Sequence, residues 1–197
     1  MRINAMIAMA VLAGTFARAE EKMRIAERGV TICFEIRATP EAGLAQVIAE
    51  KIFANIGIKT IWKDRHTCPE TGDGMIHITL VAKRSKTPYR PGVLAFAHPF
   101  EGVHIHVFVE RLRKMVHPNN MPSFLAHVLA HEISHILQGT NGHSDEGVMK
   151  ANWSPRDLAD MRFKPLDFTV NDISMIKLGL EAWALRTAGS NPQLALK

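Results

Sequence analysis

Several short stretches in the first half of the chain alternate apolar and polar residues, which is typical of β-strands with one buried face. The clearest alternation is in 103–111, where every second residue from Val103 to Val109 is valine or isoleucine. His104 and His106 share the other face, and we expect them to be half-exposed strand histidines. An alternative is that this strand lies nearest a cleft and binds an extended peptide by backbone pairing. The pattern predicts strands at 30–36, 58–63, 75–83, 93–97 and 103–111.

Helical spacing of apolar residues follows the first predicted strand and returns in the second half of the chain. A first helix is predicted to open at Thr39, with Pro40 and Glu41 in its first turn, and to end near Gly57. Its apolar stripe is expected to face the core and consists of Leu44, Val47, Ile48, Ile52 and Phe53. Later helices are predicted over 122–138, from Ser154, and over 171–185, with loops at 68–74 and 84–92 and a frayed tail at 188–197.

The N-terminus has the features of a secretory signal peptide. Arg2 provides the positive charge, residues 3–16 are apolar, and Ala17-Arg18-Ala19 is a small-residue cleavage site. We therefore expect a signal peptide at 1–19 and a single domain at 20–197, secreted or periplasmic after cleavage. The apolar stretch is shorter than the roughly 20 residues of a membrane span, so no membrane association is predicted.

The amino-acid composition limits the classes of protein to which this domain can belong. The chain has 197 residues, of which 47% are hydrophobic, which suits one globular domain that we expect to be monomeric. Its two cysteines, Cys33 and Cys68, are predicted to form a disulfide, because an exported protein with an even count usually pairs them; a catalytic thiol is the alternative. The formal net charge of +5 is mild, and the basic clusters at 83–86 and 111–114 lack interleaved aromatic residues, so no nucleic-acid binding is predicted.

The segment His131-Glu132-Ile133-Ser134-His135 carries the strongest chemical signal. It lies within the predicted helix 122–138, where residues four apart share one face at about 6 Å. Two imidazoles on that face can bind one Zn²⁺ ion, and Glu132 lies beside them as a candidate general base. A water polarised by zinc can be deprotonated near neutral pH and attack a carbonyl carbon. The motif therefore predicts a zinc hydrolase, most naturally a peptidase.

A third zinc ligand is expected soon after this helix. Gly139 suits the left-handed position that ends a helix, and His143 follows it. Asp145 and Glu146 are alternative ligands, since zinc accepts carboxylate oxygen as well as imidazole nitrogen. His127 lies one turn before His131, but three histidines at this spacing on a straight helix cannot converge on one ion.

These residues resemble the metzincin clan of zincin peptidases, whose pattern is H-E-x-x-H-x-x-G-x-x-H followed by a methionine turn. The resemblance implies His131, His135 and His143 as zinc ligands and Glu132 as the general base. It further implies that Met149 forms the Met-turn, although Met149 also fits as a plain core residue. Gly139 lies four residues after His135 rather than three, and His143 eight rather than six, so the loop has two extra residues. The run 143–149 is also similar to a segment of small secreted bacterial proteins with a metzincin-like site.

The resemblance implies an α+β zincin-like domain, with a small mixed twisted sheet, an N-terminal helix, an active-site helix and C-terminal helices. The function it implies is a secreted zinc metallopeptidase that acts on a peptide or protein substrate. One alternative is a degenerate zincin that binds zinc but acts as a non-catalytic binding module. The absence of a tyrosine after the Met-turn favours this alternative, because the single tyrosine of the chain is Tyr89. The other alternative is a structural exported domain with a fortuitous motif.

Overall fold

The computed structural model describes residues 29–35, 37–69, 74–81, 92–97 and 103–189. The signal peptide predicted at 1–19, nearly all of the loop predicted at 84–92 and most of the tail lie outside these ranges.

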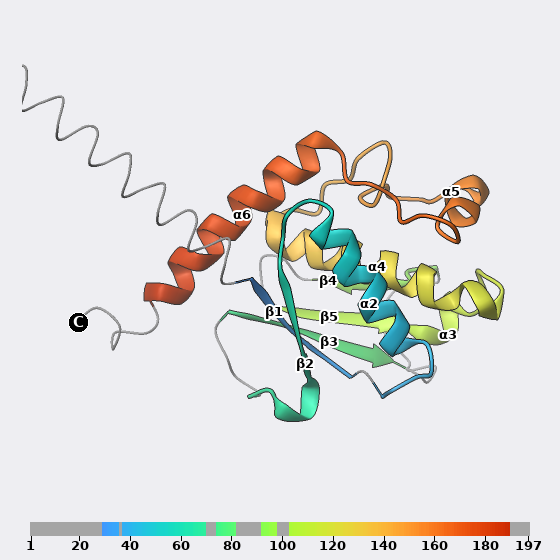
Figure 1. The fold of residues 1–197 in the computed structure, drawn as a ribbon, viewed down its shortest axis with the longest axis horizontal. Helices are drawn as coiled ribbons and strands as arrows, with labels where there is room; N and C mark the ends of the chain where they lie inside the picture. Colours follow the sequence, from blue (N-terminus) through green and yellow to red (C-terminus); the bar gives the residue numbers. More distant parts are fainter. Residues whose placement is uncertain (1–28, 36, 70–73, 82–91, 98–102, 190–197) are drawn as a thin grey trace, which may run out of the picture.

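In the described residues, five strands form one sheet in the order β2-β1-β3-β5-β4 (Figure 1). Their bounds are β1 Val30–Phe34, β2 Thr60–Asp64, β3 Met75–Val81, β4 Ala95–Ala97 and β5 His104–Phe108. Neighbouring strands are parallel, except that β4 pairs with β5 in the antiparallel direction. The small mixed sheet that was predicted is confirmed.

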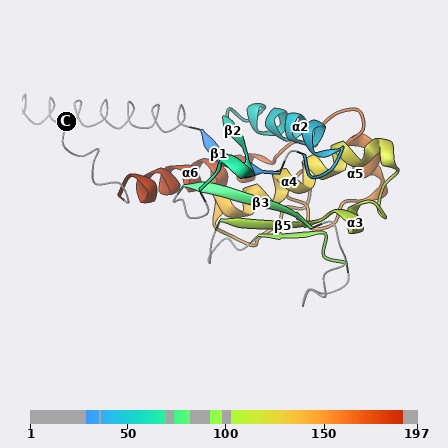
Figure 2. The same ribbon diagram turned by 90° about the horizontal axis from the view of Figure 1, so that it is seen from below.

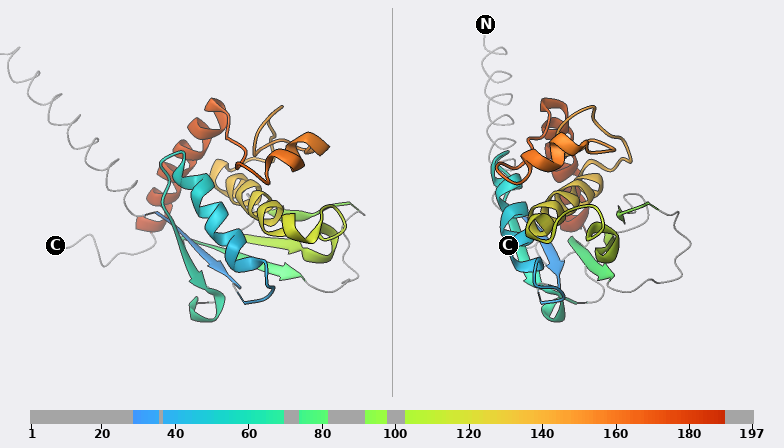
Figure 3. Two further views of the ribbon diagram at one scale, coloured as in Figure 1. Left: turned by 45° about the vertical axis from the view of Figure 1, so that its right-hand side comes forward. Right: turned by 90° about the vertical axis from the view of Figure 1, so that its right-hand side faces the viewer.

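The two central helices cover one face of this sheet (Figure 2). These are α2 (Ala42–Ala54) and α4 (Met121–Gln138), which pack against each other, and α6 (Val170–Gly189) packs in turn on α4. Figure 3 shows the same stacking of helices over the sheet from two further sides. The shorter helices are η1 Arg65–Thr67, α3 Val109–Leu112, η2 Pro118–Asn120 and α5 Pro155–Asp160. Within the described residues, no helix has the length and apolar character needed to cross a membrane.

The prediction for the buried face of α2 is partly wrong. Leu44 and Val47 were expected in the core, yet they are 55% and 58% exposed. The buried face consists of Ala42, Ala45, Ala49, Ile52 and Phe53. Small alanines allow α2 to approach its neighbours closely, and this fit outweighs the larger hydrophobic transfer energy of a leucine and a valine.

The last predicted strand is too long, because β5 ends at Phe108 and the short helix α3 begins at Val109. Val109 and Leu112 are both fully buried, at a spacing that matches one helical turn. Apolar residues at 103, 105, 107 and 109 continue the strand pattern past the point where the backbone turns, so periodicity alone misses the end.

The disulfide predicted between Cys33 and Cys68 is present, with the two Cα atoms 6.2 Å apart. It links β1 to the segment that follows η1. Cys33 is fully buried at the register position next to His77 of β3. The bridge therefore ties the parallel centre of the sheet to the connection that leads into β3.

Candidate metal centre

Helix α4 positions the two histidines of the motif. It runs through the middle of the molecule, and residues 124–137 are all buried. Gly139 ends the helix in the left-handed conformation, with φ of 64°, and its N–H donates to the carbonyl of His135. This is the turn that the sequence predicts, and it redirects the chain from the helix into the loop that carries His143.

The imidazoles of His131 and His135 converge on one point, with their Nε2 atoms 3.0 Å apart. Each ring is oriented by a backbone carbonyl: Nδ1 of His131 donates to Val148 and Nδ1 of His135 donates to Thr140, both at 2.9 Å. A carbonyl can only accept, so each Nδ1 carries the proton and each Nε2 keeps a free lone pair. This arrangement is typical of histidines that bind a metal.

His143 completes a group of three. The nearest ligand atoms of His131, His135 and His143 all lie within 4.8 Å of one another. Unlike the other two, His143 is exposed on its loop. Of the described residues, these three histidines alone form a potential metal-binding group of this size, and neither Asp145 nor Glu146 belongs to it. The structure therefore brings together the three residues that the sequence pointed to.

Glu132 lies beside these histidines in a protected environment and is only 8% exposed. Burial raises the pKa of its carboxyl to about 7, although a hydrogen bond with the backbone of Ala97 acts in the opposite direction. A carboxyl group whose pKa lies near neutral pH can both accept and release a proton under ordinary conditions.

The candidate site opens into a cavity of about 700 Å³. The three histidines and Glu132 lie in its wall, together with the segment 92–97 that contains β4. The rest of the lining includes the apolar side chains of Met115, Phe124, Val128, Trp153 and Leu158 and the polar side chains of Asn141, Lys150 and Asn152. The strand at the cavity is thus β4 and not 103–111, and β4 lies at one edge of the sheet. The alternative considered for His104 and His106 is therefore wrong: neither lines the cavity, and their rings stack on His77 and Phe96.

Comparisons with known proteins support the fold. No family model and no curated protein matches the chain. Among solved structures, it is similar to the crystal structure of archaemetzincin from Methanopyrus kandleri, with a TM-score of 0.52 and 18% sequence identity. The similarity covers 78% of this chain and 96% of that one. The chain has a zincin-like fold. At this level of identity the similarity shows the fold alone, and the function has to be inferred from the residues of the site.

In this zincin-like fold, the turn after the third histidine is closely packed. Gly147 has a φ of 73°, and a Cβ atom there would lie 2.2 Å from the carbonyl oxygen of Asp167. Met149 is fully buried, and its carbonyl accepts the N–H of Ser144 at 2.9 Å. Val148, whose carbonyl orients His131, donates its own N–H to Asp167. The segment 147–149 is therefore held between the ligand loop and the segment that precedes α6.

Trp153 is a site residue that the sequence pattern did not reveal. Its indole N–H donates to the carbonyl of Gly147 at 3.1 Å, and its ring contacts the ring of His131 edge-on with centroids 5.6 Å apart. It also forms part of the cavity wall. No motif or spacing distinguishes this tryptophan from a core residue, so sequence reasoning had no means of finding it.

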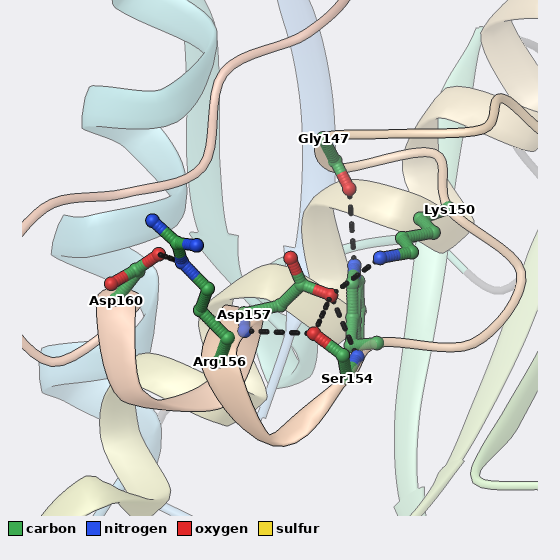
Figure 4. Close-up of polar contacts among 7 residues, drawn as sticks. Gly147, Lys150, Ser154, Arg156, Asp157 and Asp160 are labelled. Atoms are coloured by element: carbon green, nitrogen blue, oxygen red, sulfur yellow. Dashed lines mark hydrogen bonds and ion pairs between the residues drawn. The ribbon is translucent and has the colours of Figure 1, made fainter.

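The wall segment that follows is fixed by a cap at α5, shown in Figure 4. The Asp157 carboxylate accepts hydrogen bonds from Ser154 and from the Lys150 ammonium group, the latter at 2.7 Å. Partial burial alone would raise the pKa of Asp157, but these hydrogen bonds outweigh it and hold the pKa at about 2. Lys150 lines the cavity, so this ion pair holds part of the cavity wall in place.

His127 is not a ligand, which agrees with the geometric argument from the helix. Its Nδ1 donates to the carbonyl of Ser123 at 2.7 Å, and its Nε2 accepts the N–H of Leu166 at 3.0 Å. Both ring nitrogens are thus used, and the imidazole is fully buried. Burial lowers the pKa of His127 to about 4, so that the ring is neutral at ordinary pH.

Proposed function

We propose that this protein is a zinc-dependent metallopeptidase. The observation that carries the proposal is the convergence of His131, His135 and His143 beside the buried carboxyl of Glu132, in the wall of one cavity. Three histidines with a neighbouring carboxylate are a common protein environment for a catalytic zinc ion, in which a fourth position stays open.

The residues present fit a zinc ion. In His131 and His135 the carbonyl partners fix the tautomer and leave Nε2 available, so the donor set is formed before any metal binds. Imidazole nitrogen is among the preferred ligands of zinc. Neutral imidazoles add no charge, so a zinc ion held by these three histidines would keep its full positive charge. Met149 would form the Met-turn under this proposal, as the metzincin resemblance implies.

A zinc ion at this site would supply Lewis-acid chemistry, polarising a peptide carbonyl and making a bound water acidic. Glu132 would accept the proton of the attacking water on its carboxylate and pass it to the leaving amine. The burial of Glu132 would limit the access of bulk water to that proton. The strand β4, at one edge of the sheet, would bind the substrate backbone in an extended form, as a strand added to the sheet.

A peptide or protein is therefore the proposed substrate, and we propose that the enzyme acts as a monomer outside the cytoplasm. The disulfide and the predicted signal peptide support export. A second candidate is a zinc-binding module without activity, and the two extra residues in the ligand loop and the exposure of His143 favour it.

The test combines metal analysis with cleavage of a mixed peptide library by the purified protein. We expect one zinc per chain and cleavage that falls by about 100-fold or more in Glu132→Gln, with zinc retained. Glu146→Gln is the matched control, because it removes an exposed acid on the ligand loop and should leave both properties unchanged. Zinc without cleavage would favour the binding module, and absence of zinc from the wild type would overturn both candidates.

A further inference from the structure

The exposed loop that carries His143 needs a restraint, because His131 and His135 are held by a buried helix and His143 is not. The next residue, Ser144, is held by two hydrogen bonds. Its backbone N–H donates to the carbonyl of Met149 at 2.9 Å, and its hydroxyl donates to Asp172 at 2.6 Å. Ser144 is therefore held in two directions, immediately beside the proposed third ligand.

Asp172 is suited to act as a fixed anchor. It lies in the first turn of α6 and is only 4% exposed. Its Oδ1 accepts the Ser144 hydroxyl, whereas Oδ2 accepts the N–H and the hydroxyl of Thr169, at 3.0 and 2.7 Å. Thr169 in return accepts the N–H of Asp172, which completes a capping box at the start of the helix. One carboxylate oxygen thus caps α6, while the other is free to hold the loop.

Helix α6 is itself fixed relative to the other two ligands. It crosses the end of α4 so closely that a Cβ atom at Gly179 would lie 1.5 Å from the carbonyl oxygen of Leu137. Leu137 follows His135 by two residues on α4. Ser144 is therefore connected, through Asp172 and α6, to α4, the helix that carries His131 and His135.

We propose that Asp172, acting through the Ser144 hydroxyl, is a positioning residue for the third metal ligand. This inference rests on the proposed function, in that it takes His143 to be a zinc ligand. Asp172 holds the residue beside His143 and so limits the conformations of a loop two residues longer than the metzincin pattern. A ligand restrained in its binding position loses less conformational entropy when the metal binds, and the affinity is correspondingly higher.

The test measures zinc affinity and the visible absorption of the Co²⁺-loaded protein, neither of which depends on catalysis. Ser144→Ala removes the hydroxyl but leaves the capping box of α6 intact. We expect the zinc dissociation constant to rise by about tenfold or more. We also expect the Co²⁺ bands to move toward those of His143→Ala. Ser144→Thr, which keeps the hydroxyl, should restore both properties.

Thr169→Ala is the matched control, because it removes a hydrogen bond from the same carboxylate without touching the ligand loop. It should lower the unfolding temperature of the metal-free protein but leave zinc affinity at the wild-type value. Equal losses of affinity in Thr169→Ala and Ser144→Ala would overturn the inference, since the effect would then belong to helix α6 as a whole. Wild-type affinity in Ser144→Ala, with weak binding in His143→Ala, would overturn it and leave the proposed function standing. Unchanged affinity in His143→Ala would overturn both.

Discussion

The buried histidine His127 makes a quantitative prediction about stability and pH. Burial lowers its pKa to about 4, from 6.5 for an exposed histidine. Between these two values the unfolded chain binds a proton that the folded protein excludes. The free energy of unfolding therefore falls as the pH decreases from 6.5 to 4, and this contribution levels off below pH 4. Each pH unit between the two pKa values is worth about 1.4 kcal/mol, so His127 accounts for roughly 3 kcal/mol.

The perturbation that isolates this contribution is His127→Leu, which has a similar volume and no titratable group. At pH 7 the variant loses the hydrogen bond to Ser123 and leaves the N–H of Leu166 without its partner, so it should be less stable by about 1 to 3 kcal/mol. On acidification the wild type loses a further 3 kcal/mol or so that the variant does not lose. The gap between the two proteins should therefore close, or reverse, by pH 4.

The assay is urea unfolding followed by far-UV circular dichroism, at a series of pH values and with a chelator present. The chelator is needed because acid would also release a bound metal ion. Burial likewise lowers the pKa values of His131 and His135, but both residues remain in the variant, so their contributions cancel in the difference between the curves. Between pH 7 and 9 the gap should be constant, which serves as an internal control. A gap that also stays constant from pH 7 to 4 would refute the reasoning.

Two further predictions concern packing and covalent structure. Gly179→Ala should lower the free energy of unfolding by about 1 to 3 kcal/mol, because its Cβ would overlap the carbonyl of Leu137 and force α6 away from α4; an unchanged unfolding temperature in a thermal melt would contradict this close crossing. The double variant Cys33→Ala, Cys68→Ala should lose about 3 to 4 kcal/mol, since the bridge joins residues 35 apart in the sequence. Neither cysteine belongs to the candidate metal group, so metal analysis of the folded double variant should give the same zinc content as the wild type.

Local features of the sequence account for most of what was predicted correctly. The spacing of His131 and His135 places both on one face of any α-helix, whatever surrounds it. Gly139 ends that helix because a residue without a Cβ adopts the left-handed conformation at little cost. Alternation of apolar residues likewise located all five strands of the sheet within a few residues. These features depend on neighbours within about one turn or one strand.

Partners distant in the chain were beyond the reach of such reasoning. β4 borders the cavity as the antiparallel strand at one edge of the sheet. The order of strands in a sheet cannot be predicted from the residues of any single strand. The face of α2 that is buried follows from how closely its alanines allow it to pack, which outweighs the hydrophobicity of Leu44 and Val47. In each case the outcome depends on surfaces contributed by several elements at once.

The candidate site divides in the same way. By itself, the sequence determined the three histidines and Glu132, because their chemistry and spacing form a pattern that can be recognised without a structure. Only the tertiary structure decided what orients and supports them: the carbonyl of Val148, the ring of Trp153 and the carboxylate of Asp172. The physical reason is that a metal ligand is identified by its own side chain. A supporting residue is identified only by what lies next to it, and those neighbours are brought together by folding.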